Sequence, residues 1–148
     1  EVDSCNLMIN KIKNNSVCQS LLTGQDVIYE EPGIKSINGT WWKGKADCIN
    51  KDQGLLVDIK TTGDINRFRK SASIYNYDSQ AYLYREIFGY DLVFLVICKK
   101  THQIAVYDCS DEFYERGSYK VKLALEQYEK LIADPLFDLK DYVKEGTL

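Results

Sequence analysis

The sequence has a single histidine, His102, and no pair of cysteines in C-x-x-C spacing. The odd and scattered set of five cysteines predicts reduced thiols rather than a disulfide framework or a zinc site (Cys5, Cys18, Cys48, Cys98 and Cys109). His102 falls in a predicted turn, and its isolation excludes a Ser-His-Asp or Cys-His mechanism supported by further histidines. Candidate chemistry therefore has to come from carboxylates and lysines.

The sequence also lacks a hydrophobic run of membrane-spanning length, a recognisable signal peptide, internal repeats and low-complexity segments. We therefore expect an intracellular, cytoplasmic protein without a membrane segment. Hydrophobic residues make up 45% and charged residues 28% of the 148 positions, which is typical of one globular domain covering residues 1–148. The chain begins inside a helical pattern, so we expect an N-terminally trimmed fragment.

Excess positive charge is missing as well, since the formal net charge is −3. This balance disfavours nucleic-acid binding, because phosphate neutralisation supplies most non-specific affinity. The distribution is uneven, however: residues 35–70 contain eight Lys or Arg and four acids, whereas residues 108–145 contain six bases and ten acids. The pattern is consistent with a basic functional surface on an otherwise acidic protein, although many surfaces that bind no ligand show a similar charge asymmetry.

Periodicity along the chain predicts an α/β fold with a mixed central β-sheet flanked by helices. A helix with a break near Asn14-Asn15-Ser16 comes first, and a strand from Gln25 to Glu31 is expected to end at Pro32-Gly33. The remaining expected elements are strands over 42–49 and 55–59, a helix over 71–88, strands over 92–98 and 103–109, and a helix over 111–133.

Charged residues occur on two of these strands, which is unexpected for buried segments. Alternation places Asp58 and Lys60 on one face of their strand and Asp47 on the charged face of the preceding one. With residue 49 opposite 54, Asp47 lies diagonal to Asp58; a register shifted by two residues brings the carboxylates directly opposite each other. Two converging carboxylates beside a lysine match the needs of a Mg²⁺ site that binds water and phosphate.

Three motifs together resemble the PD-(D/E)xK nucleases, and most closely the RecE and lambda-type exonucleases of phage recombination systems. They are Gly44-Lys45-Ala46-Asp47, Asp58-Ile59-Lys60-Thr61-Thr62 and Gln80-Ala81-Tyr82-Leu83-Tyr84. A lone D-x-K arises often by chance, but the ordered combination is specific and extends over roughly residues 25 to 110. The resemblance implies a restriction-endonuclease-like core and a Mg²⁺-dependent deoxyribonuclease, specifically a 5′-to-3′ exonuclease on double-stranded DNA.

The resemblance also implies roles for individual residues. Metal would be held by Asp47, Asp58 and the backbone carbonyl of Ile59, while Lys60 orients the attacking water and Gln80 and Tyr84 border the site. Mn²⁺ is expected to substitute for Mg²⁺. Related sites use a further upstream ligand, and here three acids remain as candidates: Asp26, Glu31 and Glu1. Similarity further suggests a homo-oligomer and a strand-annealing protein as partner.

The polar segment from Gly63 to Lys70 suits contacts to backbone phosphates, with an exposed loop of no function as the equal alternative. The predicted DNA-binding residues are Lys43, Lys45, Thr61, Thr62, Arg67, Arg69 and Lys70. Two other functions remain open: an endonuclease on the same core, and a catalytically silent module that binds nucleic acid or protein.

Overall fold

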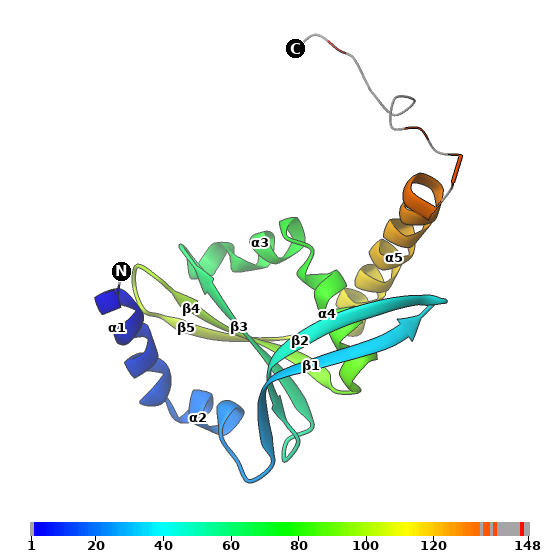
Figure 1. The fold of residues 1–148 in the computed structure, drawn as a ribbon. Helices are drawn as coiled ribbons and strands as arrows, with labels where there is room; N and C mark the ends of the chain where they lie inside the picture. The colour runs from blue at the N-terminus through cyan, green and yellow to red at the C-terminus, as the bar shows by residue number, and fades with distance from the viewer. Residues whose placement is uncertain (1, 134, 137, 139–145, 147–148) are drawn as a thin grey trace.

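The computed structural model describes residues 2–133, 135–136, 138 and 146. A five-stranded sheet with the order β1-β2-β3-β4-β5 lies between two sets of helices (Figure 1). Its strands are β1 (Val27–Ile37), β2 (Thr40–Asn50), β3 (Leu55–Thr62), β4 (Asp91–Cys98) and β5 (Ile104–Asp108). Only β3 and β4 run parallel, so the predicted mixed sheet is confirmed.

Helices cover both faces of the sheet. On one face lie α1 (Val2–Lys13) and α2 (Ser16–Leu22), which the Asn14-Asn15 break separates as expected. Asn15 caps α2 by accepting a hydrogen bond from the Cys18 amide at 3.1 Å. The other face is covered by α3 (Phe68–Ile74), which the short helix η1 (Ile65–Arg67) precedes, and by α4 (Tyr77–Phe88) and α5 (Asp111–Tyr128).

Each face of the sheet has its own hydrophobic core. Beneath α1 and α2 the core is small and comprises Cys18, Leu21, Cys48, Val57, Val93 and Leu95. The larger core beneath α3, α4 and α5 includes Leu56, Phe68, Ala81, Phe94, Val96 and Tyr114. Strand β4 is buried on both faces from Leu92 to Cys98, as expected for a strand enclosed between two helical layers.

The β1–β2 hairpin extends beyond the main sheet and packs on α4 (Figure 1). Its two central glycines, Gly33 and Gly44, face each other across the ladder. An added Cβ would lie 2.5 Å from Ile87 at Gly33 and 2.9 Å from Tyr84 at Gly44. Glycine at both positions thus permits the helix to approach the hairpin closely, and so fixes α4 beneath the site described below.

Strand β1 corrects the sequence prediction, because it does not end at Pro32-Gly33 but continues to Ile37. As the edge strand of the sheet, β1 tolerates a proline, which lacks the amide hydrogen that a central strand would need.

The β2–β3 register also differs from the first of the two alternatives. Ile49 pairs with Leu56, not with residue 54, so the structure has the register shifted by two residues. Gly54, at φ +67°, is part of the turn and does not pair within the ladder.

The predicted helix over 71–88 is two helices. Phe68–Ile74 forms α3, which begins within the segment expected to be a loop, and α4 starts at Tyr77. The break lies at Asn76, which adopts the left-handed conformation with φ 55°.

At the C-terminal side, α5 begins where predicted, because Ser110 accepts a hydrogen bond from the Phe113 amide at 3.2 Å. It continues into a π-helical turn at Glu129–Ala133. In the described part of the chain, no helix combines the length and the apolar character that crossing a bilayer requires.

Candidate active site

The β2 and β3 strands form a fork that holds the three predicted catalytic groups. Their ladder contains only three pairs, from Asn50–Leu55 to Cys48–Val57. Beyond these pairs β2 turns away with β1, while β3 remains beside β4. Asp47 is the first residue of β2 beyond the last pair, and Asp58 is its counterpart on β3.

Asp58 is buried, with 3% of its surface exposed, and points toward α4. Its Oδ1 accepts a hydrogen bond from the Gln80 side-chain amide at 2.5 Å. Its Oδ2 lies 2.7 Å from the Lys60 ammonium, but among the described residues no donor meets Oδ2 in hydrogen-bonding geometry. One oxygen of this carboxylate therefore has a charged neighbour and spare acceptor capacity.

Lys60 is held in place from two sides. Besides its ion pair with Asp58, the ammonium lies 4.8 Å from the centroid of the Tyr77 ring. That ring stacks on Phe94 with centroids 5.5 Å apart, so the core fixes its position. The lysine side chain remains 21% exposed, which leaves its charge accessible at the mouth of the fork.

Asp47 is anchored to the neighbouring strand by its side chain. Its Oδ2 accepts a hydrogen bond from the Ile59 amide at 2.9 Å, at a position where the main-chain ladder has already ended. The expected alternation along β2 does not hold here, since Ala46 belongs to the core beneath α4 and Cys48 to the core beneath α2. The strand therefore twists between Ala46 and Cys48, and Asp47 is the residue at which the side chains change from one face of the sheet to the other.

Burial raises the pKa of Asp58 above its ordinary value. Loss of hydration is the largest cause; the Lys60 ammonium opposes it, the nearby Asp47 charge adds to it, and the Gln80 hydrogen bond opposes it. The Asp47 carboxylate is therefore close enough to contribute to the raised pKa of Asp58. Such a pair is unfavourable alone and is relieved by a cation.

The donor set at the fork fits a Mg²⁺ ion. Carboxylate oxygens of Asp47 and Asp58 and the carbonyl of Ile59 are hard ligands of the kind that Mg²⁺ prefers, and Mg²⁺ usually keeps several waters besides one or two carboxylates. The buried Oδ2 of Asp58 lies 2.7 Å from the Lys60 ammonium and keeps a further lone pair that can bind the ion.

Among the residues that the structure describes, no third acidic ligand joins the pair. Within the described residues, no group of three or more His, Cys, Asp or Glu side chains is arranged to hold a metal ion. Asp26 lies near the β2–β3 turn, 3.5 Å from Lys51, away from the fork. Glu31 pairs with Ala46, one residue from Asp47, and is partly exposed. Glu1 falls outside the described residues.

The two predicted α4 residues lie one turn apart and face β2 and β3. Gln80 fixes Asp58 as described above, and the Tyr84 hydroxyl donates a hydrogen bond to the Lys45 carbonyl at 2.9 Å. Helix α4 thus connects both arms of the fork. The four-residue spacing places both side chains on one helical face.

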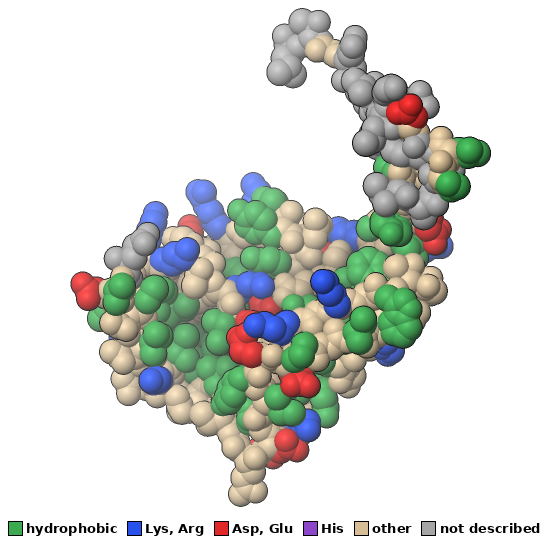
Figure 2. All heavy atoms as spheres, in the orientation of Figure 1, with side chains coloured by type: hydrophobic (Ala, Val, Ile, Leu, Met, Phe, Trp, Pro, Cys, Tyr) green, Lys and Arg blue, Asp and Glu red, His purple; other side chains and the backbone are tan. Residues whose placement is uncertain are grey.

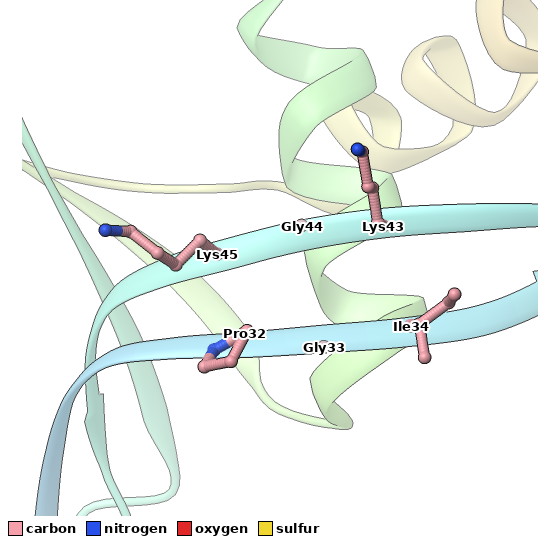
Figure 3. A pocket seen from close by; sticks show the side chains of 6 residues that line it. All are labelled: Pro32, Gly33, Ile34, Lys43, Gly44 and Lys45. Carbon is pink, nitrogen blue, oxygen red and sulfur yellow. The ribbon is translucent and has the colours of Figure 1, made fainter.

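The hairpin carries two of the predicted DNA-binding lysines on its outer surface. Figure 3 shows Lys43 and Lys45 on either side of Gly44, with α4 behind the strands. With Pro32, Gly33 and Ile34 they line a shallow hollow of about 660 Å³. Lys43 is exposed, and Lys45 forms an ion pair with Glu30, which raises the pKa of this lysine through a hydrogen bond and charge attraction.

The other predicted DNA-binding residues lie around the far end of β3. The Thr62 hydroxyl donates to the Asp64 carbonyl at 3.0 Å, whereas Thr61 is exposed. Arg67 is exposed and 3.5 Å from Asp64, and the Arg69 guanidinium lies 5.9 Å from the Tyr107 ring. Lys70 is exposed. These residues do not form one cluster with Lys43 and Lys45.

Two functional neighbours were not predicted from the sequence. The first is Tyr77, whose position three residues before Gln80 on one helical face is a sequence signal that it borders the site. The second is Asp78, which is fully buried and bound by Arg116 at 2.6 Å and Lys120 at 2.9 Å from α5. No local pattern connects residues that are 38 positions apart.

The surface around the fork is mixed in charge. Figure 2 shows acidic and basic side chains together near the centre of this face, over the crossing of β2 and β3. An area of hydrophobic side chains lies between this cluster and α1.

Comparison with solved structures supports the fold. A crystal structure of a "putative exonuclease" from Eubacterium rectale aligns with a TM-score of 0.73 and 18% identity over 99% of this chain, and the chain spans 62% of that protein. The structure of SSO0001 aligns with a TM-score of 0.45 and 19% identity over 78% of this chain and 57% of that one, which is too distant for an argument. No curated protein matches the sequence.

A family model described as a "PDDEXK-like domain of unknown function (DUF3799)" matches residues 1–136. The mixed five-stranded sheet with helices on both faces is consistent with the restriction-endonuclease-like α/β fold. The chain belongs to the PDDEXK-like family DUF3799, within the PD-(D/E)xK superfamily.

Proposed function

We propose that this protein is a Mg²⁺-dependent deoxyribonuclease, and more specifically a 5′-to-3′ exonuclease that acts on double-stranded DNA ends in a phage-type recombination system. The proposal rests on one observation: at the β2–β3 fork the buried Asp58 is paired with Lys60, and Asp47 is anchored to the amide of Ile59, the residue between them. The exonuclease mode and its polarity come from the resemblance of the motifs to RecE and lambda-type enzymes.

The residues at the fork have separate tasks in this reaction. Asp47, Asp58 and the Ile59 carbonyl would hold Mg²⁺, which would polarise the phosphate and lower the pKa of a coordinated water. Lys60, held by Asp58 and the Tyr77 ring, donates hydrogen bonds to the attacking water and to a phosphate oxygen. Gln80 keeps Asp58 in the orientation that its ligand role needs.

A digestion assay with 5′-labelled linear duplex tests the proposal. We expect cleavage that requires Mg²⁺ or Mn²⁺ and that is lost in Asp47→Ala and in Asp58→Ala, with folding checked by circular dichroism. Cleavage at the normal rate by either folded variant would refute the assigned site. Release of labelled mononucleotide first, rather than of long fragments, would support 5′-to-3′ digestion.

An endonuclease on the same core is the alternative within this class. A covalently closed circle distinguishes the two, because an exonuclease that needs an end spares it and an endonuclease opens it.

One observation favours a silent binding module: among the described residues no third acidic side chain joins Asp47 and Asp58. Calorimetric titration with Mn²⁺ separates this candidate from the enzyme. A silent module with an incomplete site would bind no Mn²⁺, whereas the nuclease should bind it and lose that binding on Asp58→Asn.

Oligomerisation and a strand-annealing partner belong to the same proposal, on the resemblance alone. Sedimentation analysis of the purified chain tests the first. Co-purification with an annealing protein encoded nearby tests the second.

A further inference from the structure

A hollow of about 570 Å³ opens beside the catalytic fork, between the sheet and the helices α1 and α2. Its lining residues include Ile9, Lys13, Gln19, Tyr29, Asp47 and Ile59. Two of them, Asp47 and Ile59, also belong to the fork. The hydrophobic area next to the charged cluster in Figure 2 lies over the same elements.

Large apolar side chains in this hollow are not covered by the described part of the chain. Ile9 is 46%, Tyr29 54% and Ile59 39% exposed. Helix α1 buries none of its residues, so its inner face has no complete packing partner within the described structure. Apolar lining with a few polar groups and a volume of this size is typical of a site for a small molecule.

The polar groups in the hollow are suited to a nucleotide. Lys13 is exposed at the rim and Gln19 is half-buried, and neither side chain has an ion pair or hydrogen-bond partner among the described residues. The Tyr29 ring is fixed, because its hydroxyl donates a hydrogen bond to the Leu22 carbonyl. A fixed, exposed aromatic ring is a platform on which a base stacks, an amide can pair with the base edge, and a cation can pair with an adjacent phosphate.

We propose that this hollow receives the deoxynucleoside attached to the scissile phosphate, with its base stacked on Tyr29. A phosphate held at Asp47 and Asp58 carries a nucleoside on each side, and the hollow begins at Asp47 itself. This inference rests on the proposed nuclease function and names the substrate subsite. It also explains why an exposed tyrosine stands beside the catalytic acids.

Calorimetry of the Mn²⁺-loaded protein tests the subsite without relying on cleavage. The probes are inorganic phosphate, thymidine 5′-monophosphate and thymidine 3′-monophosphate. Phosphate is the baseline because all three probes share contacts to the metal and to Lys60, so only the nucleoside differs. We expect at least one nucleotide to bind about tenfold or more tightly than phosphate, and the better one identifies the side of the phosphate that enters the hollow.

Three variants test whether the tighter binding of nucleotide than of phosphate arises in the hollow. Tyr29→Leu should remove most of the nucleotide's advantage over phosphate. Tyr29→Phe should keep most of it, because the stacking face remains although the hydrogen bond to Leu22 is lost. Tyr119→Leu is the matched control, since Tyr119 is 63% exposed on α5 and does not line the hollow.

Equal binding of nucleotides and phosphate by the wild-type protein would overturn the subsite, and so would a nucleotide advantage that survives Tyr29→Leu. Neither result touches the proposed function, which fails separately if the protein does not cleave DNA with Mg²⁺ or Mn²⁺.

Discussion

Asp58→Asn should make the metal-free protein more stable while it abolishes cleavage. Asp58 is 3% exposed, and its pKa is raised chiefly by burial, so the folded protein disfavours the charge that a metal ligand needs. Asparagine keeps an oxygen for the Gln80 hydrogen bond and removes the buried charge. We expect a gain of about 0.5–2 kcal/mol in the free energy of unfolding, as is common when a functional site is relaxed, or roughly 2–6 °C in Tm.

The gain should depend on pH with a defined sign. A carboxyl group whose folded pKa is raised stabilises the fold fully below its unfolded pKa, near 3.8, and loses that contribution as the pH rises through the folded value. The advantage of the asparagine variant should therefore be small in acid, grow as the pH rises from about 4, and level off once Asp58 in the folded protein is ionised. Urea denaturation at several pH values without divalent ions measures it.

In the presence of Mg²⁺ the wild type should be more stable than Asp58→Asn, the reverse of the order without metal. Mg²⁺ at a hundred times its dissociation constant stabilises the wild type by about 2.7 kcal/mol and should not stabilise the variant. Loss of one ligand costs several kcal/mol of transition-state stabilisation, so cleavage should fall by about a thousandfold or more. A metal-free variant that is less stable than the wild type at every pH would refute the reasoning, because the Lys60 ion pair would then outweigh the burial cost.

Three further predictions concern the support of α4. Gly117→Ala places a Cβ 2.0 Å from the Asp78 carbonyl, so about 3 kcal/mol of overpacking should exceed about 1 kcal/mol of helix propensity and lower the denaturation midpoint. Asp78→Asn should cost about 3 kcal/mol near neutral pH. Burial raises the pKa of Asp78, but hydrogen bonds from Lys120 and Arg116 outweigh it and lower the net value, so the cost should shrink as the pH falls through the folded pKa. A constant cost down to pH 2 would contradict this. Tyr84→Phe removes the hydrogen bond to Lys45 and should cost about 1 kcal/mol, with cleavage reduced tenfold at most; complete loss of cleavage would give the hydroxyl a direct chemical role.

Local sequence was sufficient for most elements and for the motif residues. The apolar run of β4, the alternation on β3 and the asparagine break between α1 and α2 are short-range signals, and the structure agrees with them. Prediction failed where the meaning of a residue depended on which strands lie beside it in the sheet. Pro32 looked like a strand end, but it is tolerated because β1 is an edge strand, and strand position is a property of the whole sheet.

Residue type and order were sufficient to select Asp47, Asp58 and Lys60 as candidates, because two carboxylates and a lysine on successive strands are unusual in buried segments. The spatial arrangement of these three side chains could not be predicted from the sequence. It requires the two-residue register, the divergence of β2 from β3 after Cys48, and α4 held close by Gly33 and Gly44. The hollow at Tyr29 likewise arises only where α1, α2 and three strands come together. Sequence determined which groups are available, and tertiary structure decided which of them are buried, paired or left open, because burial and distance depend on residues far apart in the chain.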